Sequence, residues 1–246
     1  DQGFADVKYD SFAPDWDAVR KITEALNRHN LKIVSHFGYF NVVDPDAARR
    51  QRGERRIELL IQNWKRFDCP VISLETGTLN KDSEWAEAPE NTSEQAYLQV
   101  RSAFERLSAA AAKTGAVLAI EPYWRNIIDS VSRTERLLRE VNSPALKLVM
   151  DPCNYFRKED LPRMQPMLKE IMTRLGSRIV IAHAKDVKAA AEGTDLPAAG
   201  RGALDYPLYL RLLAQLDREF YLVIEHLGLE DVPQVRDFVV SQIDRL

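Results

Sequence analysis

The chain has 246 residues, a formal net charge of −3 and a hydrophobic content of 45%. The length fits one or two folded domains, and the hydrophobic content excludes wholesale disorder. With 10 glycines and 12 prolines the chain is not a collagen-like protein. Because 34 basic residues face 37 acidic ones, the chain has no overall attraction to a polyanion. We therefore expect no nucleic-acid partner.

Cysteine usage and apolar runs bear on the compartment. Cys69 and Cys153 lie in unrelated sequence contexts, so they predict neither a disulfide framework nor a cysteine zinc site. No run approaches the roughly 18 consecutive apolar residues of a membrane span, so we expect no membrane partner. A reducing compartment follows from the cysteines, and we expect the protein in the cytoplasm.

In chain order, a short apolar run, a polar loop and a helical segment recur. Strands are expected at 4–9, 31–37, 70–75, 116–121, 146–151, 178–183 and 221–226. Helices are expected at 15–29, 46–66, 93–113, 132–141, 160–175, 206–216 and 232–246. This alternation, with no Ser/Gly-rich linker, predicts a single α/β domain over 1–246 with a parallel sheet.

Two architectures fit this alternation, a closed eight-stranded barrel and an open doubly wound sheet. No glycine-rich phosphate-binding loop follows the early strands, which disfavours the nucleotide-binding form of the open sheet. We therefore predict a (β/α)8 TIM barrel.

Four of the expected strands end in, or next to, a side chain that can bind a metal: Glu121, Asp151, His183 and Glu225. In a barrel the carboxyl ends of the strands meet at one mouth, where three buried carboxylates require a compensating cation. One imidazole and three carboxylates suit Mn²⁺, Mg²⁺ or Co²⁺, and Zn²⁺ also remains open. Any single carboxylate of this kind can instead cap a helix or pair with an arginine.

Further motifs accompany these residues: IEP at 120–122, MDPCN at 150–154, HAKD at 183–186 and GRGALDY at 200–206. With them the chain resembles the xylose-isomerase-like TIM-barrel superfamily over nearly its whole length. Within it, the chain is similar to sugar phosphate isomerases and epimerases, including ketose 3-epimerases and inosose isomerases. The resemblance implies a metal site of Glu121, Asp151, His183 and Glu225 that holds one divalent ion, Mn²⁺ foremost.

The beginning of the chain also resembles this family. Residues 4–9, preceded by Gly3, are similar to the family's second strand. The resemblance therefore implies that the first strand of the barrel is missing from this sequence. Since an open barrel edge is unfavourable, we expect upstream residues or a partner to cover it.

The resemblance further implies an isomerase or epimerase of a keto-sugar or cyclitol. Such an enzyme abstracts a proton next to a carbonyl and passes through an enediolate, with the metal polarising the carbonyl. In the resembling epimerases two metal-bound glutamates face opposite sides of the sugar, which implies Glu121 and Glu225 as catalytic acid and base. The expected partner is a small-molecule sugar or cyclitol, and a homo-oligomer is compatible with this fold.

Several residues near the strand ends are candidates for substrate binding. Lys185 shares the side of the strand that carries His183 and is expected to stabilise an enediolate, unless it is a surface lysine. Asn154 stands where related epimerases often have a substrate-binding histidine, so the ketose 3-epimerase substrate does not carry over directly. The other candidates are His36, Tyr39, Glu75, Trp124, Arg125 and Arg201, for which packing, an ion pair or a solvated loop is the structural alternative.

Three other functions remain open. A lyase or dehydratase acting on a keto-sugar, an inosose or a 3-keto-glycoside would use the same metal site and the same first proton abstraction. A nuclease similar to AP endonuclease IV would need about three metal ions and more histidines than the four present. A non-catalytic sugar-binding subunit is the third, and the complete set of four ligand candidates argues against it.

Overall fold

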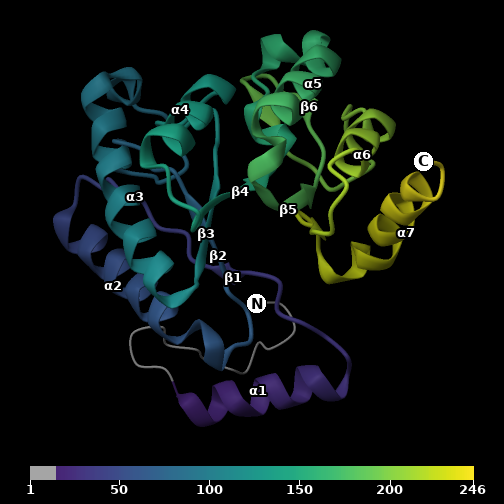
Figure 1. Cartoon of the computed structure of the whole chain (residues 1–246). Coiled ribbons are helices and arrows are strands. Elements are labelled where there is room, and N and C mark those ends of the chain that lie inside the picture. The colour runs from purple at the N-terminus through teal and green to yellow at the C-terminus, as the bar shows by residue number, and fades with distance from the viewer. Residues whose placement is uncertain (1–14) are drawn as a thin grey trace. The chain divides into compact units, whose positions relative to one another are not determined.

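The computed structural model describes residues 15–246 (Figure 1). The strand expected at 4–9 lies outside the described residues. The chain divides into two compact units. Unit 1 contains the described residues up to Ile120 together with Arg125–Ile127 and Glu140–Lys147, and unit 2 contains Glu121–Trp124, Ile128–Arg139 and Leu148–Leu246.

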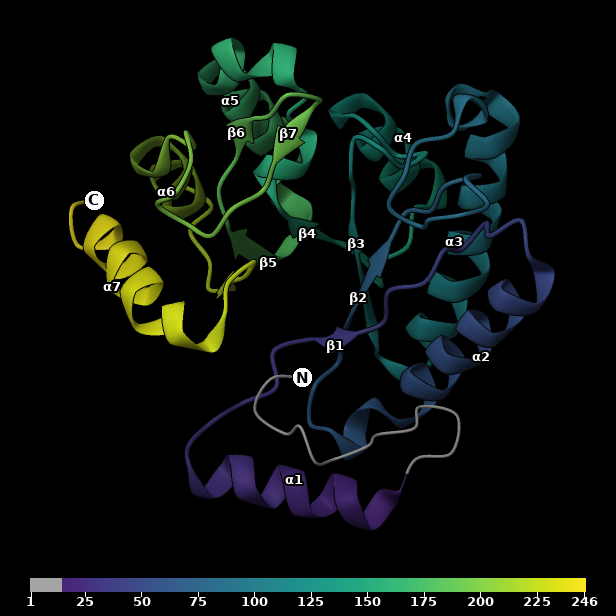
Figure 2. The same cartoon turned by 180° about the vertical axis from the view of Figure 1, so that it is seen from behind.

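Unit 1 is built on the parallel strands β1 (His36–Phe37), β2 (Val71–Glu75) and β3 (Val117–Glu121), of which the last residue, Glu121, belongs to unit 2. In β1 and β2, His36 lies beside Ile72 and Phe37 beside Ser73. The helices are α1 (Trp16–Arg28), α2 (Ala47–Asn63) and α3 (Glu94–Thr114), with short 3-10 helices η1 (Trp64–Arg66) and η2 (Pro89–Thr92). Helices α2 and α3 pack side by side, as Figure 2 also shows.

Polar side chains set the helix starts in unit 1. Asp15 and Asp46 each accept hydrogen bonds from two backbone amides in the first turn of α1 and α2, and Ser93 accepts one at the start of α3. Helix α3 ends at Gly115, whose φ of 82° lies in the left-handed region that glycine adopts without steric cost. These caps explain why the predicted helix starts at 15, 46 and 93 agree with the structure to within a residue.

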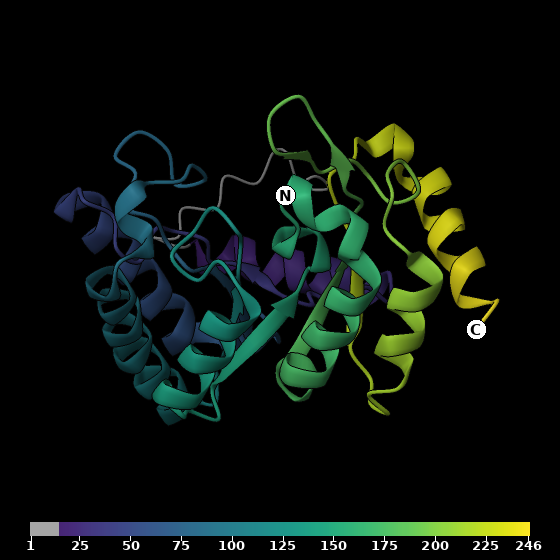
Figure 3. The same cartoon turned by 90° about the horizontal axis from the view of Figure 1, so that it is seen from above.

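Unit 2 is built on the parallel strands β4 (Leu146–Met150), β5 (Ile179–Ala184) and β8 (Tyr221–Ile224), in that order. Its helices are α4 (Val131–Val141), α5 (Met164–Leu175), α6 (Tyr206–Ala214) and α7 (Val232–Ile243). Helix α6 packs between α5 and α7, and Figure 3 shows these green-to-yellow helices next to one another. Short elements complete it: η3 (Pro152–Tyr155), η4 (Lys158–Arg163), η5 (Gly176–Arg178), η6 (Leu229–Asp231) and the hairpin of β6 (Lys188–Ala189) and β7 (Thr194–Asp195).

Three details differ from the sequence predictions. The strand expected at 31–37 forms a ladder only at His36–Phe37, while Ser35 contacts the Ser73 hydroxyl through its own side chain. The helix expected at 160–175 begins as the 3-10 helix η4, which contains Pro162, because proline supplies no backbone N–H. The hairpin β6–β7 was not predicted, since its strands have two residues each.

The helices also bear on membrane insertion, which requires a long apolar segment. None of the helices within 15–246 combines the length and apolar character needed to cross a bilayer.

Candidate metal centre

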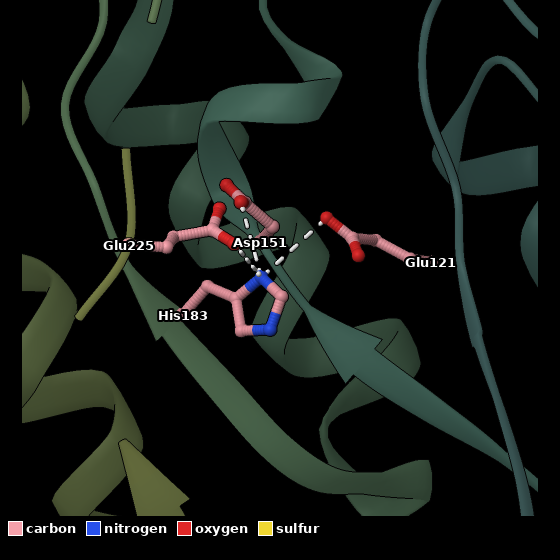
Figure 4. A group of neighbouring side chains, drawn as sticks. All are labelled: Glu121, Asp151, His183 and Glu225. Carbon is pink, nitrogen blue, oxygen red and sulfur yellow. Dashed lines mark ion pairs between the residues drawn. The ribbon is translucent and has the colours of Figure 1, made fainter. Parts of the chain in front are cut away.

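Four side chains of unit 2 gather at the carboxyl ends of strands (Figure 4). Glu121 is the last residue of β3 and His183 the second-last of β5, while Asp151 and Glu225 directly follow β4 and β8. Since side chains alternate along a strand, Glu225 points to the same face as Val223, which lies beside His183 in the ladder. The period of two therefore brings His183 and Glu225 together from strands about 40 residues apart.

The imidazole of His183 is at the centre of this group. Its Nδ1 atom lies 3.2 Å from Oε2 of Glu225, 3.5 Å from Oε1 of Glu121 and 3.5 Å from Oδ2 of Asp151 (Figure 4). One ligand atom from each of the four residues lies within 4.8 Å of the others. Glu121, Asp151 and His183 are buried, and Glu225 is half-buried. The four candidate ligands thus form one cluster.

Lys185, two residues after His183, belongs to the same cluster. Its Nζ atom lies 2.7 Å from Oδ2 of Asp151 and 3.0 Å from Oε1 of Glu225, and the side chain is 3% exposed. Three carboxylates and one ammonium leave two negative charges in a buried place, which is costly without further compensation. A divalent cation would balance this charge with His183 neutral.

The donor atoms fit such a cation. Within the described residues, Nδ1 of His183 is buried and makes no hydrogen bond of good geometry, although three carboxylate oxygens face it. A metal ion can be coordinated by an imidazole nitrogen and three carboxylate oxygens at the same time. The oxygen-rich set favours a hard ion such as Mn²⁺ or Mg²⁺.

Electrostatic interactions within the cluster favour positive charge at its centre. Burial alone would raise the pKa of Glu225, but the nearby imidazole of His183 and the charge of Lys185 outweigh it and lower that pKa to about 2. Burial would likewise lower the pKa of His183, yet Glu121 and the other carboxylates raise it well above its usual value. Glu225 is therefore held ionised, as a metal ligand must be.

Asp151 combines two roles that the sequence left as alternatives. Its Oδ1 atom accepts a hydrogen bond from the backbone N–H of Cys153 at 3.0 Å and so caps η3. The other oxygen, Oδ2, faces His183 and Lys185. The cap fixes the carboxylate and leaves one oxygen available to an ion.

Asn154 lies against Glu121. Its side-chain amide donates to Oε1 of Glu121 at 2.7 Å, and its backbone carbonyl accepts from the N–H of Trp124 at 2.9 Å. Asn154 is 5% exposed. The structure therefore gives this residue a contact with a candidate ligand.

The remaining sequence candidates have other surroundings. Trp124 is buried and is covered by the guanidinium of Arg157, whose carbon lies 4.8 Å from the ring centroid. Arg201 is paired through two nitrogens with the carboxylate of Asp231. His36 and Glu75 belong to unit 1, where the ring of His36 packs edge-on against Phe67 at 4.7 Å.

Asp186 is an organising residue that sequence reasoning missed. Its buried carboxylate accepts hydrogen bonds from the backbone amides of Val187, Gly200 and Leu204 at 2.8–3.0 Å. This fixes the loop that follows β5. The sequence does hold a signal for this role, because an acidic residue follows the apolar strand in the HAKD motif and Gly200 and Gly202 lie in the loop after it.

Comparison with known proteins identifies the family. The family model for the xylose isomerase-like TIM barrel matches residues 2–238. The chain belongs to this family, and the predicted TIM-barrel fold is confirmed. A search of curated proteins found no match.

Solved structures share the fold at low identity. A D-tagatose 3-epimerase-like protein is 16% identical with a TM-score of 0.73, over 95% of this chain and 84% of that one. A xylose isomerase-like TIM barrel protein from Mycobacterium smegmatis in complex with magnesium is 16% identical with a TM-score of 0.68, over 95% and 81%. A 3-keto-D-glucoside 4-epimerase from E. coli is 16% identical with a TM-score of 0.67, over 94% and 86%.

Proposed function

We propose that the protein is a divalent-metal-dependent isomerase or epimerase of a keto-sugar or cyclitol. The observation that carries this proposal is the buried cluster in which three carboxylate oxygens lie within 3.5 Å of Nδ1 of His183. Membership of the xylose isomerase-like family supports it. So does the occurrence, on the same fold, of an epimerase of a keto-sugar derivative and of a protein in complex with magnesium.

The proposed centre consists of one ion, with Mn²⁺ as the leading candidate, held by Glu121, Asp151, His183 and Glu225. When bound, such an ion polarises a carbonyl oxygen of the substrate and makes the neighbouring C–H bond more acidic. Glu121 ends β3 and Glu225 directly follows β8, so each presents its carboxylate from its own direction. In this proposal one glutamate removes the proton beside the carbonyl and the other returns one.

Lys185 supplies fixed positive charge for this reaction. Its ammonium is buried and contacts both Asp151 and Glu225, and burial, which alone would lower its pKa, is outweighed by these carboxylates, which raise it. Lys185 therefore stays protonated. We assign it to stabilising the oxygen anion of the enediolate, since a preorganised charge in a dry site acts without reorganisation.

We further propose that residues 1–246 form one barrel domain and that the protein works in the cytoplasm on a small-molecule substrate. Asn154 orients Glu121 through its hydrogen bond, and it is also assigned to substrate binding. The other residues assigned to substrate binding are His36, Glu75, Trp124 and Arg201, although the last two already have partners within the chain.

Metal content tests the centre directly. We expect purified protein incubated with Mn²⁺ to hold one equivalent by mass spectrometry, and His183→Ala to lose it. His29→Ala, at the exposed end of α1, is the matched control and should keep the ion. Wild-type protein without metal in excess Mn²⁺ would contradict the proposal, and about three zinc ions per chain would favour a nuclease.

Proton exchange tests the chemistry. In D₂O with a panel of keto-sugars and inososes, the wild-type protein should incorporate deuterium next to the carbonyl, measured by NMR. Glu121→Gln and Glu225→Gln should each abolish incorporation, while Glu135→Gln, which removes an ion pair with Arg174 outside the cluster, should not. Exchange that survives in either site variant removes that glutamate from the assignment, and an eliminated product in the same spectra would indicate a dehydratase.

A further inference from the structure

Apart from Arg201, the proposed function gives no role to the segment 200–206, which leads into helix α6. The helix begins at Tyr206, and the side chain of Asp205 caps it by accepting a hydrogen bond from the N–H of Leu208 at 3.0 Å. Tyr206 and Tyr209 are three residues apart and therefore lie on one face of the helix. They are 2% and 0% exposed, so both hydroxyls need a partner inside the protein.

The two hydroxyls reach backbone carbonyls in β5 and directly after it, next to the candidate ligand His183. The hydroxyl of Tyr209 donates to the carbonyl of His183 at 3.0 Å and lies 3.4 Å from the carbonyl of Met150, the residue before Asp151. The hydroxyl of Tyr206 donates to the carbonyl of Lys185 at 2.8 Å. Helix α6 thus contacts the main chain of two residues whose side chains face the cluster.

The strand needs these donors because its ladder ends here. The pairing of β5 with β4 stops at Ala182, opposite Met150, and its pairing with β8 stops at Ala184, opposite Ile224. The carbonyl of Ala184 still accepts the N–H of Glu225, whereas the carbonyls of His183 and Lys185 accept side-chain donors, with the thiol of Cys153 also 3.6 Å from the carbonyl of Lys185. A buried carbonyl without any donor would be costly. The two tyrosines supply hydroxyl donors to these two carbonyls.

We propose that Tyr206 and Tyr209 are positioning residues of the metal centre, which fix the imidazole of His183 and the ammonium of Lys185 through their backbone carbonyls. This inference rests on the proposed function. The segment 200–206 helps to place these tyrosines. Asp186 accepts hydrogen bonds from the amides of Gly200 and Leu204 and so fixes the chain just before α6. The motif thereby supports the centre, in addition to the substrate contact proposed for Arg201.

Metal affinity tests this role without any substrate. Mn²⁺ binding is measured by calorimetry, and its coordination by electron paramagnetic resonance, for the wild type, Tyr209→Phe and Tyr206→Phe. Groups that orient a metal ligand typically contribute a factor of about 10–100 to metal affinity. We therefore expect Tyr209→Phe to weaken Mn²⁺ binding on the order of tenfold and to alter the spectrum. Tyr206→Phe acts through Lys185 and should weaken binding by a smaller factor.

The matched control is Tyr97→Phe in unit 1. Tyr97 is also fully buried, and its hydroxyl donates to Glu140 at 2.9 Å, so the substitution removes a comparable hydrogen bond from an unrelated place. It should lower the thermal midpoint as the other two variants do but leave Mn²⁺ affinity unchanged. Should Tyr209→Phe fail to fold, Tyr206→Phe provides the same comparison from the second tyrosine.

The outcomes separate the two proposals. If the wild type binds Mn²⁺ and folded Tyr209→Phe and Tyr206→Phe bind it as tightly and with the same spectrum, the positioning role is overturned while the metal centre stands. If the wild type itself binds no Mn²⁺, the metal centre falls, and the positioning role falls with it.

Discussion

The side-chain amide of Asn154 donates a hydrogen bond to Oε1 of Glu121 at 2.7 Å, in a place where both residues are buried. The same Asn154 accepts the backbone N–H of Trp124 through its carbonyl. One residue of η3 therefore holds both the carboxylate at the end of β3 and the chain that follows it. Because an amide carries no charge, it can orient Glu121 without neutralising it.

This contact predicts the effect of removing the amide. Asn154→Ala should slow solvent-deuterium exchange by about 10–100-fold, the range observed when a group that orients a ligand is lost. Asn154→His retains a hydrogen-bond donor and should recover part of the rate. Exchange at the wild-type rate in Asn154→Ala would show that Glu121 does not depend on this hydrogen bond.

Metal binding should stabilise the fold. An ion that binds only the folded state adds about 2.7 kcal/mol at a concentration one hundred times its Kd. We therefore expect excess Mn²⁺ to raise the thermal midpoint of the wild type and a chelator to lower it again, measured by scanning fluorimetry. The midpoint of His183→Ala should not respond to Mn²⁺, whereas that of His29→Ala should rise as in the wild type.

His36 predicts how stability depends on pH. Burial lowers the pKa of its imidazole from 6.5 to about 4, opposed in part by a backbone hydrogen bond at Cys69. Above the ordinary pKa both states are neutral and His36 adds no pH dependence. As the pH falls from 6.5 toward 4, the unfolded state takes up the proton first, so the free energy of unfolding decreases by up to about 3 kcal/mol.

The measurement is urea unfolding of the wild type and His36→Gln between these pH values. The variant should lose less stability on acidification, because the side chain that titrates differently in the two states is gone. His29→Gln, at the exposed end of α1, should follow the wild-type curve. Parallel curves for the wild type and His36→Gln would contradict the prediction.

The loop after β5 tolerates no side chain at Gly202. A Cβ atom there would lie 2.4 Å from Oδ1 of Asp186 and 2.6 Å from the carbonyl oxygen of Val187, so backbone must move. Gly202→Ala should therefore reduce the free energy of unfolding by about 1–3 kcal/mol. Gly228→Ala is the control, since its Cβ meets only the movable side chain of Glu230, and it should stay within about 0.5 kcal/mol of wild type.

Chemical denaturation of both glycine variants checks this comparison. If Gly202→Ala is as stable as Gly228→Ala, the loop has more freedom than the contacts of Asp186 indicate. A loss confined to Gly202→Ala would show that the hydrogen bonds of this carboxylate hold the loop in one conformation.

Local patterns along the chain determine much of the fold. The runs that form β2, β3, β4 and β5 are mostly apolar and bounded by polar loops, and Ser93 and Asp46 mark helix starts by their capping chemistry. The short β1, the 3-10 start at η4 and the hairpin β6–β7 were not predictable in the same way. Each depends on which backbone groups find partners in space, and not on the periodicity of the residues themselves.

For the candidate site, the sequence by itself determined which residue types end the strands: Glu121, Asp151, His183 and Glu225. The alternation of strands and helices also predicts a barrel, in which these strand ends converge. Only the tertiary structure decided that Asn154 holds Glu121, that Lys185 bridges Asp151 and Glu225, and that two tyrosines of α6 support β5. These contacts join residues about 20–40 positions apart through single hydrogen bonds or ion pairs, whose geometry is set by packing and leaves no repeating pattern in the chain.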